Sequence, residues 1–215
     1  MLVLALETSE RTGSIALVRD EALLEEALLE PGKGHGARLL AAVDALLRRQ
    51  GVAIGDIDRF AASAGPGSFT GVRVGLGTAR ALAWSLGKPV VALPSLLVLA
   101  HNVRGALAAP VMDACKGEVY GALYDGEVEL VAPSVAAPER WRETVLAAAA
   151  SRPTVFFGSG TATFQDVFGP GGADPSAHAA TLGRLAARAR EPLPAAVARY
   201  VRPSEAELKH GLRNR

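Results

Sequence analysis

The chain has 215 residues, of which 49% are hydrophobic and only 5% aromatic, and its formal net charge is +1. This length allows one large domain or two small ones with a buried core. Nearly balanced charge and few aromatic residues argue against a dedicated nucleic-acid binder, which needs a basic stripe and stacking side chains. The exception is a basic tail, which we expect to be solvated and to add only weak contacts to RNA held by a partner. It consists of Arg199, Arg202, Lys209, His210, Arg213 and Arg215.

The single cysteine, Cys115, excludes an intramolecular disulfide and a cysteine-based zinc site. A reducing cytoplasm is therefore the expected location, and we expect Cys115 to pack within a buried strand rather than to react. The apolar run at the N-terminus lacks a positive leader and ends at Glu7, so it is interpreted as a first strand. No apolar run reaches the roughly 18–20 residues of a membrane helix, which predicts no membrane span.

The first half of the chain, residues 1–103, is predicted to contain three strands followed by alternating helices and strands. Apolar residues recur at helical spacing after residue 37, with charged residues on the other faces, which is typical of an amphipathic helix. The predicted strands are 2–6, 14–19, 22–30, 57–64 and 89–92, and the predicted helices are 37–50, 70–86 and 94–103.

The second half, residues 104–215, repeats the pattern of the first in a shorter form. An apolar strand, an acidic residue, a polar turn and a second strand occupy residues 110–124, which places Asp113 where Glu7 stands in the first half. We therefore predict two βββαβα halves that arose by duplication. The remaining predictions are a strand at 126–131, a helix at 138–150, a strand at 154–157, a loop at 158–175 and a helix at 177–190.

A glycine-rich stretch at 64–78 joins a predicted strand to a predicted helix. It is not a Walker loop, because Val72 and Arg73 follow Gly71 where a Lys-Ser or Lys-Thr pair is required. It is not a dinucleotide fingerprint either, since its glycines are spaced one residue too far apart. Ser68 is interpreted as a helix cap. The unpaired N–H groups at the start of this helix are suited to an anion, and the alternative is a tight turn that needs glycine only for its backbone.

Small residues recur every fourth position on the helix predicted after this loop. Gly71, Gly75, Ala79 and Ala83 share one face, which lets another chain segment approach very closely. Each glycine within a helix costs about 0.5–1 kcal/mol relative to alanine, so a compensating contact is expected. That contact is either with the sheet of the same domain or with a helix of another subunit, and the spacing leaves both open.

Each half has an acidic residue at its first turn. Glu7 and Asp113, facing each other across two halves, are suited to a magnesium-bound phosphate. Glu7 is followed by Thr-Ser without a glycine, so we expect an acid at a turn or on the surface and weak nucleotide affinity. The candidate phosphate or nucleotide residues are Glu7, Ser68, Thr70, Gly71 and Asp113. No histidine pair has metal-ligand spacing and no serine elbow exists, so neither a metal site nor a catalytic residue is predicted.

Four segments together resemble the TsaB (YeaZ) family, in order and over more than half of the chain. They read LALETS at 4–9, GPGSFTGVRVGLG at 65–77, PSL at 94–96 and MDACKGEVY at 112–120, and YVRP at 200–203 is similar to the end of the family. The resemblance implies an α/β, actin-like ATPase fold with two ribonuclease-H-like halves. The family often has Asp where Glu7 stands, which weakens any magnesium-nucleotide role for this position.

The resemblance also implies a function. It is that of a non-catalytic subunit that helps to place threonylcarbamoyl on N6 of adenosine 37 in tRNAs that read codons beginning with A. The catalytic sister TsaD carries metal-binding histidines that this chain lacks, and a small ATPase, TsaE, joins the complex, through which tRNA is mainly contacted. Helices 37–50 and 70–86 would pair with those of TsaD or of a second copy in a homodimer. Their predicted interface residues are Leu39, Leu40, Val43, Leu46, Leu47, Gly71, Val72, Gly75, Leu76, Ala79, Leu82 and Ala83.

No cofactor is expected to be required by this chain, while weak or interface-shared binding of ATP or ADP stays open. Two rival functions stay open. One is an independent kinase or ATPase that uses Glu7, Asp113 and the turn at 68–71, and the other is a metallopeptidase.

Overall fold

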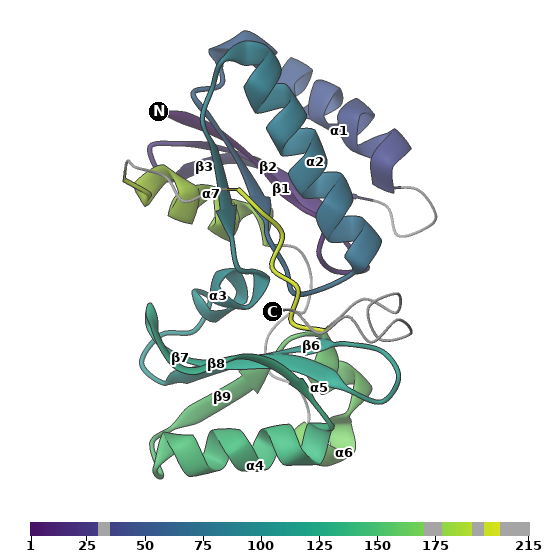
Figure 1. Ribbon diagram of the computed structural model, residues 1–215. Coiled ribbons are helices and arrows are strands. Elements are labelled where there is room, and N and C mark those ends of the chain that lie inside the picture. Colours follow the sequence, from purple (N-terminus) through teal and green to yellow (C-terminus); the bar gives the residue numbers. More distant parts are fainter. Residues whose placement is uncertain (30–34, 170–177, 191–195, 203–215) are drawn as a thin grey trace.

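The computed structural model describes residues 1–29, 35–169, 178–190 and 196–202. Two sheets lie one above the other in Figure 1, with helices packed against both faces of each. The upper sheet has the strand order β3-β2-β1-β4-β5, and the lower sheet has the order β8-β7-β6-β9. No described helix is both long and apolar enough to span a bilayer.

The first sheet is built from strands whose side chains alternate between two apolar layers. Leu4 and Leu6 pack with α1 and α2 on one face, whereas Val3 and Ala5 pack with α7 on the other, as the two-residue period of a strand requires. The elements of this half are β1 Leu2–Glu7, β2 Ser14–Arg19, β3 Ala22–Leu28, α1 His35–Arg49, the 3-10 helix η1 Ile54–Asp56, β4 Arg59–Ser63, α2 Phe69–Leu86, β5 Val90–Leu93 and α3 Ser95–Ala100.

The second half repeats the topology of the first. Strand β6 pairs antiparallel with β7 and parallel with β9, just as β1 pairs antiparallel with β2 and parallel with β4. The order βββαβα thus occurs twice, which confirms the predicted duplication and its shorter second copy. The elements are β6 Leu107–Asp113, β7 Val119–Asp125, β8 Val128–Ala136, α4 Pro138–Ala149, β9 Thr154–Phe157, α5 Ser159–Thr163, α6 Gln165–Phe168 and α7 Ala179–Arg188.

Helix α7 returns to the first half, although the sequence division at 103/104 assigns it to the second (Figure 1). Its residues Leu182 and Ala186 are buried against the first sheet. A side chain at Gly183 would meet Val18 at 2.7 Å, so the helix lies very close to β2. The free face of a sheet must be covered by some element, and here a helix distant in sequence covers it.

Residues 196–202 run along the first half and end on the second (Figure 1). The backbone N of Arg199 donates to the carbonyl of Ala64 at 2.7 Å. The guanidinium of Arg202 donates to the carbonyl of Ala114 at 2.8 Å and pairs with Glu118. The prediction of a solvated basic tail is therefore wrong for Arg202, while residues 209–215 lie outside the described part of the chain.

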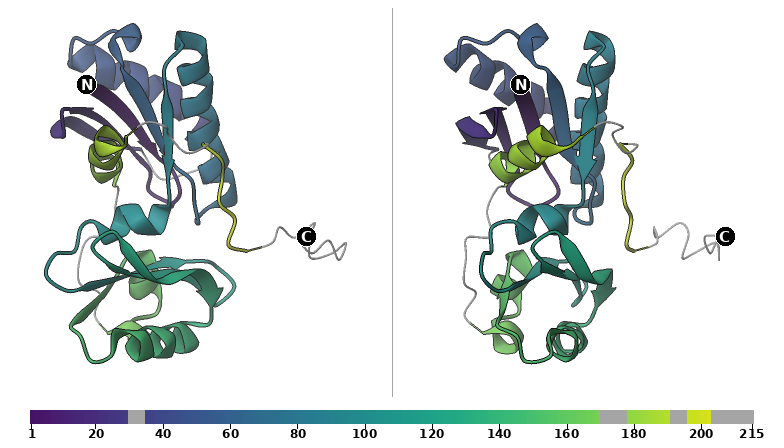
Figure 2. Two further views of the ribbon diagram at one scale, coloured as in Figure 1. Left: turned by 60° about the vertical axis from the view of Figure 1, so that its left-hand side comes forward. Right: turned by 90° about the vertical axis from the view of Figure 1, so that its left-hand side faces the viewer.

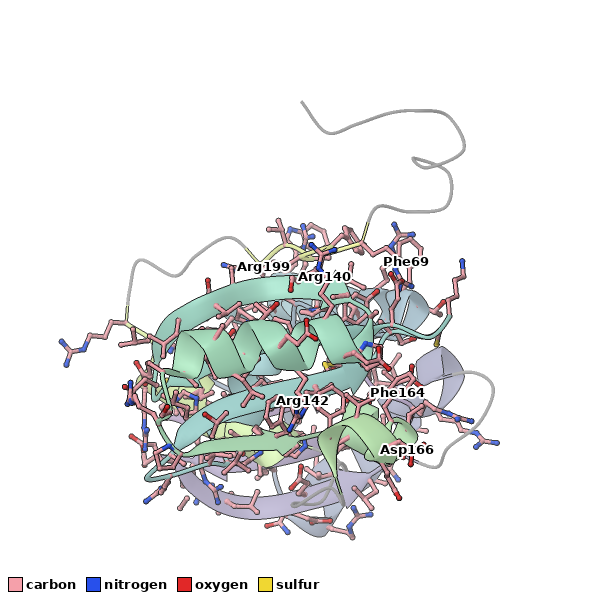
Figure 3. The ribbon with its side chains drawn as sticks, turned by 90° about the horizontal axis from the view of Figure 1, so that it is seen from below. Phe69, Arg140, Arg142, Phe164, Asp166 and Arg199 are labelled. Atoms are coloured by element: carbon pink, nitrogen blue, oxygen red, sulfur yellow. The ribbon has the colours of Figure 1, made fainter. Side chains whose placement is uncertain are left out.

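The predicted loop at 158–175 is wrong for its first part, which forms the short helices α5 and α6. Figure 3 shows them beside α4, with Phe164 and Asp166 labelled. Helices of five and four residues present too few positions for an apolar period to be recognised. Gly158 and Gly169, at φ 109° and 79°, stand immediately outside the helices.

Candidate functional site

The stripe of small residues on α2 packs against its own domain. A Cβ atom would lie 2.0 Å from the carbonyl oxygen of Thr8 if built at Gly71, and 2.2 Å from the Thr8 hydroxyl if built at Gly75. That hydroxyl donates to the carbonyl of Gly71 at 2.7 Å. Of the two alternatives left open by the spacing, the intramolecular contact is the one formed. The stripe is therefore not an available surface.

Most of the predicted interface side chains lie in the core of this chain. Apolar residues with the strongest helical period turn toward the first sheet, because burying them there removes the most apolar surface from water. Leu82 is partly buried against the same core, and Leu40 is 53% exposed. The buried members of the predicted set, which cannot reach a partner, are Leu39, Val43, Leu46, Leu47, Gly71, Val72, Gly75, Leu76, Ala79 and Ala83.

The opposite side of α2 is exposed, and we call it the outer face. It consists of Phe69, Arg73, Gly77, Arg80, Ala81 and Trp84. Trp84 is 88% exposed, which is unusual because tryptophan has a large apolar ring that is mostly buried in folded proteins. These positions follow each other at intervals of three or four residues, so the same periodicity that predicted the buried face could have identified this one. Figure 2 shows α2 along the flank of the molecule, on the opposite side of the first sheet from α7.

An aromatic and cationic cluster lies at the start of this outer face. The guanidinium carbon of Arg73 is 3.6 Å from the ring centroid of Phe69, and its Nε donates to the hydroxyl of Tyr200 at 2.8 Å. The two rings are 5.5 Å apart. A cation over an aromatic face contributes about 0.5–1 kcal/mol at an exposed site. The cluster fixes Arg73 and joins the C-terminal segment to α2.

The two acidic turns have equivalent geometry. The backbone N of Ser9 donates to Glu7 Oε1 at 2.7 Å, and the backbone N of Cys115 donates to Asp113 Oδ1 at the same distance. Each carboxylate thus accepts from the amide two residues further on, at the end of the first strand of its half. Glu7 and Asp113 occupy the matching places that the sequence predicts.

The surroundings of the two turns differ from expectation. Glu7 stands at the start of the β1–β2 turn, which is one of the two predicted positions, but it is buried and the hydroxyl of Ser63 donates to it, so the other, a surface position, is wrong. Burial raises the pKa of Glu7, against the opposing effect of hydrogen bonds from Ser63 and Ser9. Cys115 is exposed, so the expectation that it packs within a buried strand is wrong. Strand β6 ends at Asp113, and Cys115 lies in the turn between β6 and β7.

Glu10 connects the two turns and was not predicted. The hydroxyl of Ser159 donates to Glu10 Oε1 at 3.0 Å and accepts from the backbone N of Asp113 at 3.1 Å. Burial raises the pKa of Glu10 to about 7; the bond from Ser159 lowers it, and the charges of Glu7 and Asp113 raise it further. The duplication offered a signal, since a serine stands at the start of the helix that follows β9, as Ser68 does at the helix that follows β4.

The glycine-rich loop is occupied by contacts within the chain. Ser68 caps α2 as predicted, its hydroxyl accepting from the backbone N of Gly71 at 3.2 Å. The backbone N of Ser68 donates to the carbonyl of Ser9 at 2.7 Å. A Cβ atom at Gly67 would lie only 2.3 Å from that same oxygen. The N–H groups of Ser68 and Gly71 already donate within the chain. The loop therefore has fewer free N–H groups to bind a phosphate than the sequence suggests. Thr70 is exposed at the start of α2.

The structure thus brings Glu7, Ser68 and Gly71 to one end of the first sheet and links them through Glu10 to Asp113. Within the described ranges, no group of three or more His, Cys, Asp or Glu side chains is arranged to hold a metal ion. The arrangement serves to connect the two halves by hydrogen bonds.

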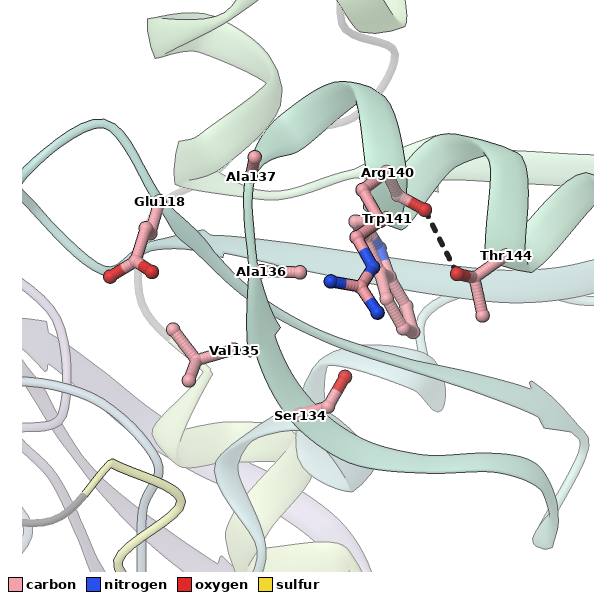
Figure 4. A pocket seen from close by; sticks show the side chains of 8 residues that line it. All are labelled: Glu118, Ser134, Val135, Ala136, Ala137, Arg140, Trp141 and Thr144. Carbon is pink, nitrogen blue, oxygen red and sulfur yellow. Dashed lines mark hydrogen bonds between the residues drawn. The ribbon is translucent and has the colours of Figure 1, made fainter.

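Two surface hollows lie on the second half, and Glu118 of the β6–β7 turn lines the first of them. The first has a volume of about 420 Å³ between the end of β8 and the start of α4 (Figure 4). It is lined by Glu118, Ser134, Val135, Ala136, Ala137, Arg140, Trp141 and Thr144. The second, of about 460 Å³, is lined by residues 103–107, 125–126 and 152–153. Neither hollow contains a predicted site residue.

Comparisons with known proteins agree with this architecture. The family profile described as "TsaD: tRNA N6-adenosine threonylcarbamoyltransferase" matches residues 30–202. The chain is 36% identical over 224 residues to the tRNA threonylcarbamoyladenosine biosynthesis protein TsaB of Bacillus subtilis (strain 168), covering 99% of this chain and 92% of that protein. The solved structure of YeaZ from Pseudomonas aeruginosa superposes with a TM-score of 0.72 at 31% identity, covering 93% of this chain and 99% of that one.

A more distant likeness bears on the fold alone. Component A of (R)-2-hydroxyglutaryl-CoA dehydratase from Acidaminococcus fermentans superposes with a TM-score of 0.53 at 8% identity, covering 87% of this chain and 98% of that one. The duplicated βββαβα halves define a protein of the actin-like ATPase fold. The chain belongs to the TsaB (YeaZ) family of proteins of tRNA threonylcarbamoyladenosine biosynthesis.

Proposed function

We propose that this protein acts in the formation of threonylcarbamoyladenosine in tRNA as a non-catalytic scaffold subunit. It binds a TsaD sister subunit, TsaE joins that pair, and the group is transferred to N6 of adenosine 37 in tRNAs that read ANN codons. The observation that carries the proposal is the match to the Bacillus subtilis protein TsaB over 99% of this chain. The proposal places the protein in the cytoplasm, where tRNA reaches it mainly through the complex.

The state of the acidic turns supports a non-catalytic role. Glu7 is buried and hydrogen-bonded, and the loop at 65–71 is closed by contacts with Thr8 and Ser9. A general base or phosphate loop needs groups within reach of a substrate. In this proposal the chain requires no cofactor of its own, and the sister subunit supplies the reacting groups.

The outer face of α2 supports the scaffold role. Trp84 is 88% exposed, and Leu40 on the neighbouring α1 is 53% exposed. Tryptophan is among the residues that contribute most to binding when a partner buries it. An interface of standard size removes about 800 Å² from each partner, which two adjacent helices can supply. The partner therefore binds the outer face rather than the buried side of these helices.

Binding to the sister subunit tests the contact. We expect Trp84→Ala to weaken the complex of the purified chain with TsaD by about tenfold or more, as measured by calorimetry. Leu146→Ala is the matched control, since Leu146 is 44% exposed on α4 in the other half and should leave affinity unchanged. Equal affinities for wild type and Trp84→Ala would remove the outer face from the proposal.

A cellular experiment tests the function. Expression of this chain in a bacterium depleted of its own TsaB should restore threonylcarbamoyladenosine in tRNA, quantified by mass spectrometry of the digested nucleosides. Magnesium-ATP added to the isolated chain should give no turnover. Modification of tRNA by the purified chain without a sister subunit, or rapid ATP hydrolysis, would contradict the proposed role.

A further inference from the structure

The hollow between the end of β8 and the start of α4, which we call the α4 hollow, is lined by the eight residues labelled in Figure 4. Its volume of about 420 Å³ is within the size range of small-molecule sites. The one acid of its lining, Glu118, already pairs with Arg202. The guanidinium of Arg140 has no partner among the described residues. The uncompensated charge of the α4 hollow is therefore positive.

Trp141 lines the α4 hollow and carries a buried donor that is not used. Its side chain is 1% exposed, and its Nε1 has no hydrogen-bond partner in the described part of the chain. The ring rests on β7, where a Cβ atom at Gly121 would lie 2.2 Å from it. Buried tryptophan N–H groups usually find an acceptor. An unpaired donor at the wall of a hollow indicates an acceptor that a ligand supplies.

The backbone at the start of α4 adds to the same side of the α4 hollow. The N-cap residue, Ala137, has no side chain that could accept from the first N–H groups of the helix. These groups lack carbonyl partners within the helix, and the positive end of the helix dipole lies beside them. Glu139, the acidic residue of the first turn, is exposed and does not line the hollow. Arg140, Trp141 and the helix start thus all favour an anion.

The remaining wall of the α4 hollow is apolar and limits the kind of anion. Val135 and Ala136 of β8 lie beside the indole ring of Trp141 (Figure 4). An inorganic ion would leave this surface in contact with water, whereas an apolar group would cover it. A nucleic-acid backbone is a poor fit, because it binds through several cations and this hollow has one that is unpaired.

We propose that the α4 hollow binds a small organic anion. Its carboxylate accepts hydrogen bonds from the Arg140 guanidinium and from Trp141 Nε1, and its apolar body covers Val135 and Ala136. A guanidinium and a carboxylate can form two parallel hydrogen bonds, which fixes the orientation of the ligand. This site is independent of the proposed function, because α4 and the outer face of α2 belong to different halves (Figure 1).

The indole N–H signals test the proposal. The chain has two tryptophans, so Trp84→Phe, at an exposed position, leaves the signal of Trp141 alone in a ¹H–¹⁵N spectrum. We expect 3-phenylpropionate to shift this signal to saturation. Uncharged 3-phenylpropanamide and inorganic phosphate, which has no apolar body, should bind at least about tenfold more weakly. A signal that 3-phenylpropionate does not move, or an equal response to the amide or to phosphate, would overturn the proposal.

A matched pair of variants on α4 tests the role of Arg140. Figure 3 shows Arg140 and Arg142 on opposite sides of the helix, and Arg142 does not line the α4 hollow. In the Trp84→Phe background, Arg140→Met should weaken binding of 3-phenylpropionate by at least about tenfold, whereas Arg142→Met should leave it unchanged. Equal weakening in both variants would overturn the site, because the overall charge of α4 would then be responsible. Circular dichroism melting establishes that both variants are folded.

The carboxylate of such a ligand can belong to a free acid or to the C-terminus of a peptide. Acetyl-Gly-Gly-Leu with a free carboxyl group carries the same chemistry at the end of a chain. Tighter binding of this peptide than of 3-phenylpropionate would assign the site to a chain terminus, and weaker binding would assign it to a free acid. No sister subunit enters these experiments, so their outcome is separate from that of the proposed function.

Discussion

Gly75 and Gly77 are two residues apart on α2 and have opposite surroundings. A Cβ atom at Gly75 would lie 2.2 Å from the Thr8 hydroxyl, whereas one at Gly77 would have nothing within 4 Å. We expect Gly75→Ala to lower the free energy of unfolding by about 1–3 kcal/mol through overpacking. Gly77→Ala should raise it by about 0.5–1 kcal/mol by restricting the unfolded chain. Urea unfolding measures both, and similar effects of the two substitutions would contradict the packing described here.

Glu10 gives a pH-dependent prediction. Because burial raises its pKa to about 7, the folded protein keeps a proton on Glu10 over a range in which the unfolded chain, near the usual value of 4.5, has lost it. The free energy of unfolding therefore falls as pH rises from about 4.5 to 7. Glu10→Gln should reduce the difference in stability between pH 5 and pH 8 by on the order of 1–3 kcal/mol.

The control for this prediction is Glu139→Gln, an exposed acid in the first turn of α4. Glutamine at position 10 retains a carbonyl oxygen for the Ser159 hydroxyl, so the contact between the halves is preserved. A pH dependence that is unchanged in Glu10→Gln would show that Glu10 is ionised in the folded protein. Both variants are measured by urea unfolding at the two pH values.

At the scale of elements, Arg59 holds the end of α7 on the first sheet. Its Nη1 donates to the carbonyls of Ala186 and Ala189, both at 2.7 Å. A cation at a helix C-terminus satisfies carbonyls that lack a partner within the helix and interacts favourably with the helix dipole. We expect Arg59→Leu to cost about 1–3 kcal/mol and to accelerate hydrogen exchange first in α7.

Arg188→Ala is the control for Arg59. Arg188 pairs with Glu21 at 2.6 Å at an exposed position, where an ion pair contributes about 0–1 kcal/mol. It should leave the exchange of α7 almost unchanged. Equal acceleration in both variants would mean that the buried bonds of Arg59 do not anchor the helix.

Periodicity and turn residues predicted the helices and strands better than they predicted which elements pack against one another. Strands 14–19 and 154–157 were predicted with the observed bounds, because each is a short apolar run between turn residues. Helix α2 shows the limit, since small residues suit close packing against any neighbour. The structure, with Thr8 beside Gly71 and Gly75, is needed to show that these glycines face inward. The burial of Glu7 likewise depends on Ser63, 56 residues away, and a local pattern carries no such information.

At the scale of the whole molecule, two sets of polar contacts among the described residues join the halves, in addition to the packing of α3 on the second sheet. One is the Glu10–Ser159 bond between the acidic turns, and the other is the segment 196–202, which runs from α2 to the β6–β7 turn. The family resemblance implied two halves, but it did not imply that the chain would return across both. The segment 196–202 contacts the outer face of α2 at one end and the second half at the other. We therefore expect a change in the angle between the halves to affect binding of a partner at the outer face.

Arg202 provides the test of this connection. Its guanidinium donates to the Ala114 carbonyl and pairs with Glu118, so Arg202→Gln removes an ionic tie to the second half. With Cys115 replaced by serine, spin labels at Ser85→Cys on α2 and Glu143→Cys on α4 report the distance between halves. We expect Arg202→Gln to broaden the distance distribution in double electron–electron resonance. Arg199→Gln should not, because Arg199 connects through its backbone N to Ala64. Identical distributions in wild type and Arg202→Gln would mean that the Glu10–Ser159 bond and the α3 packing fix the halves without the C-terminal segment.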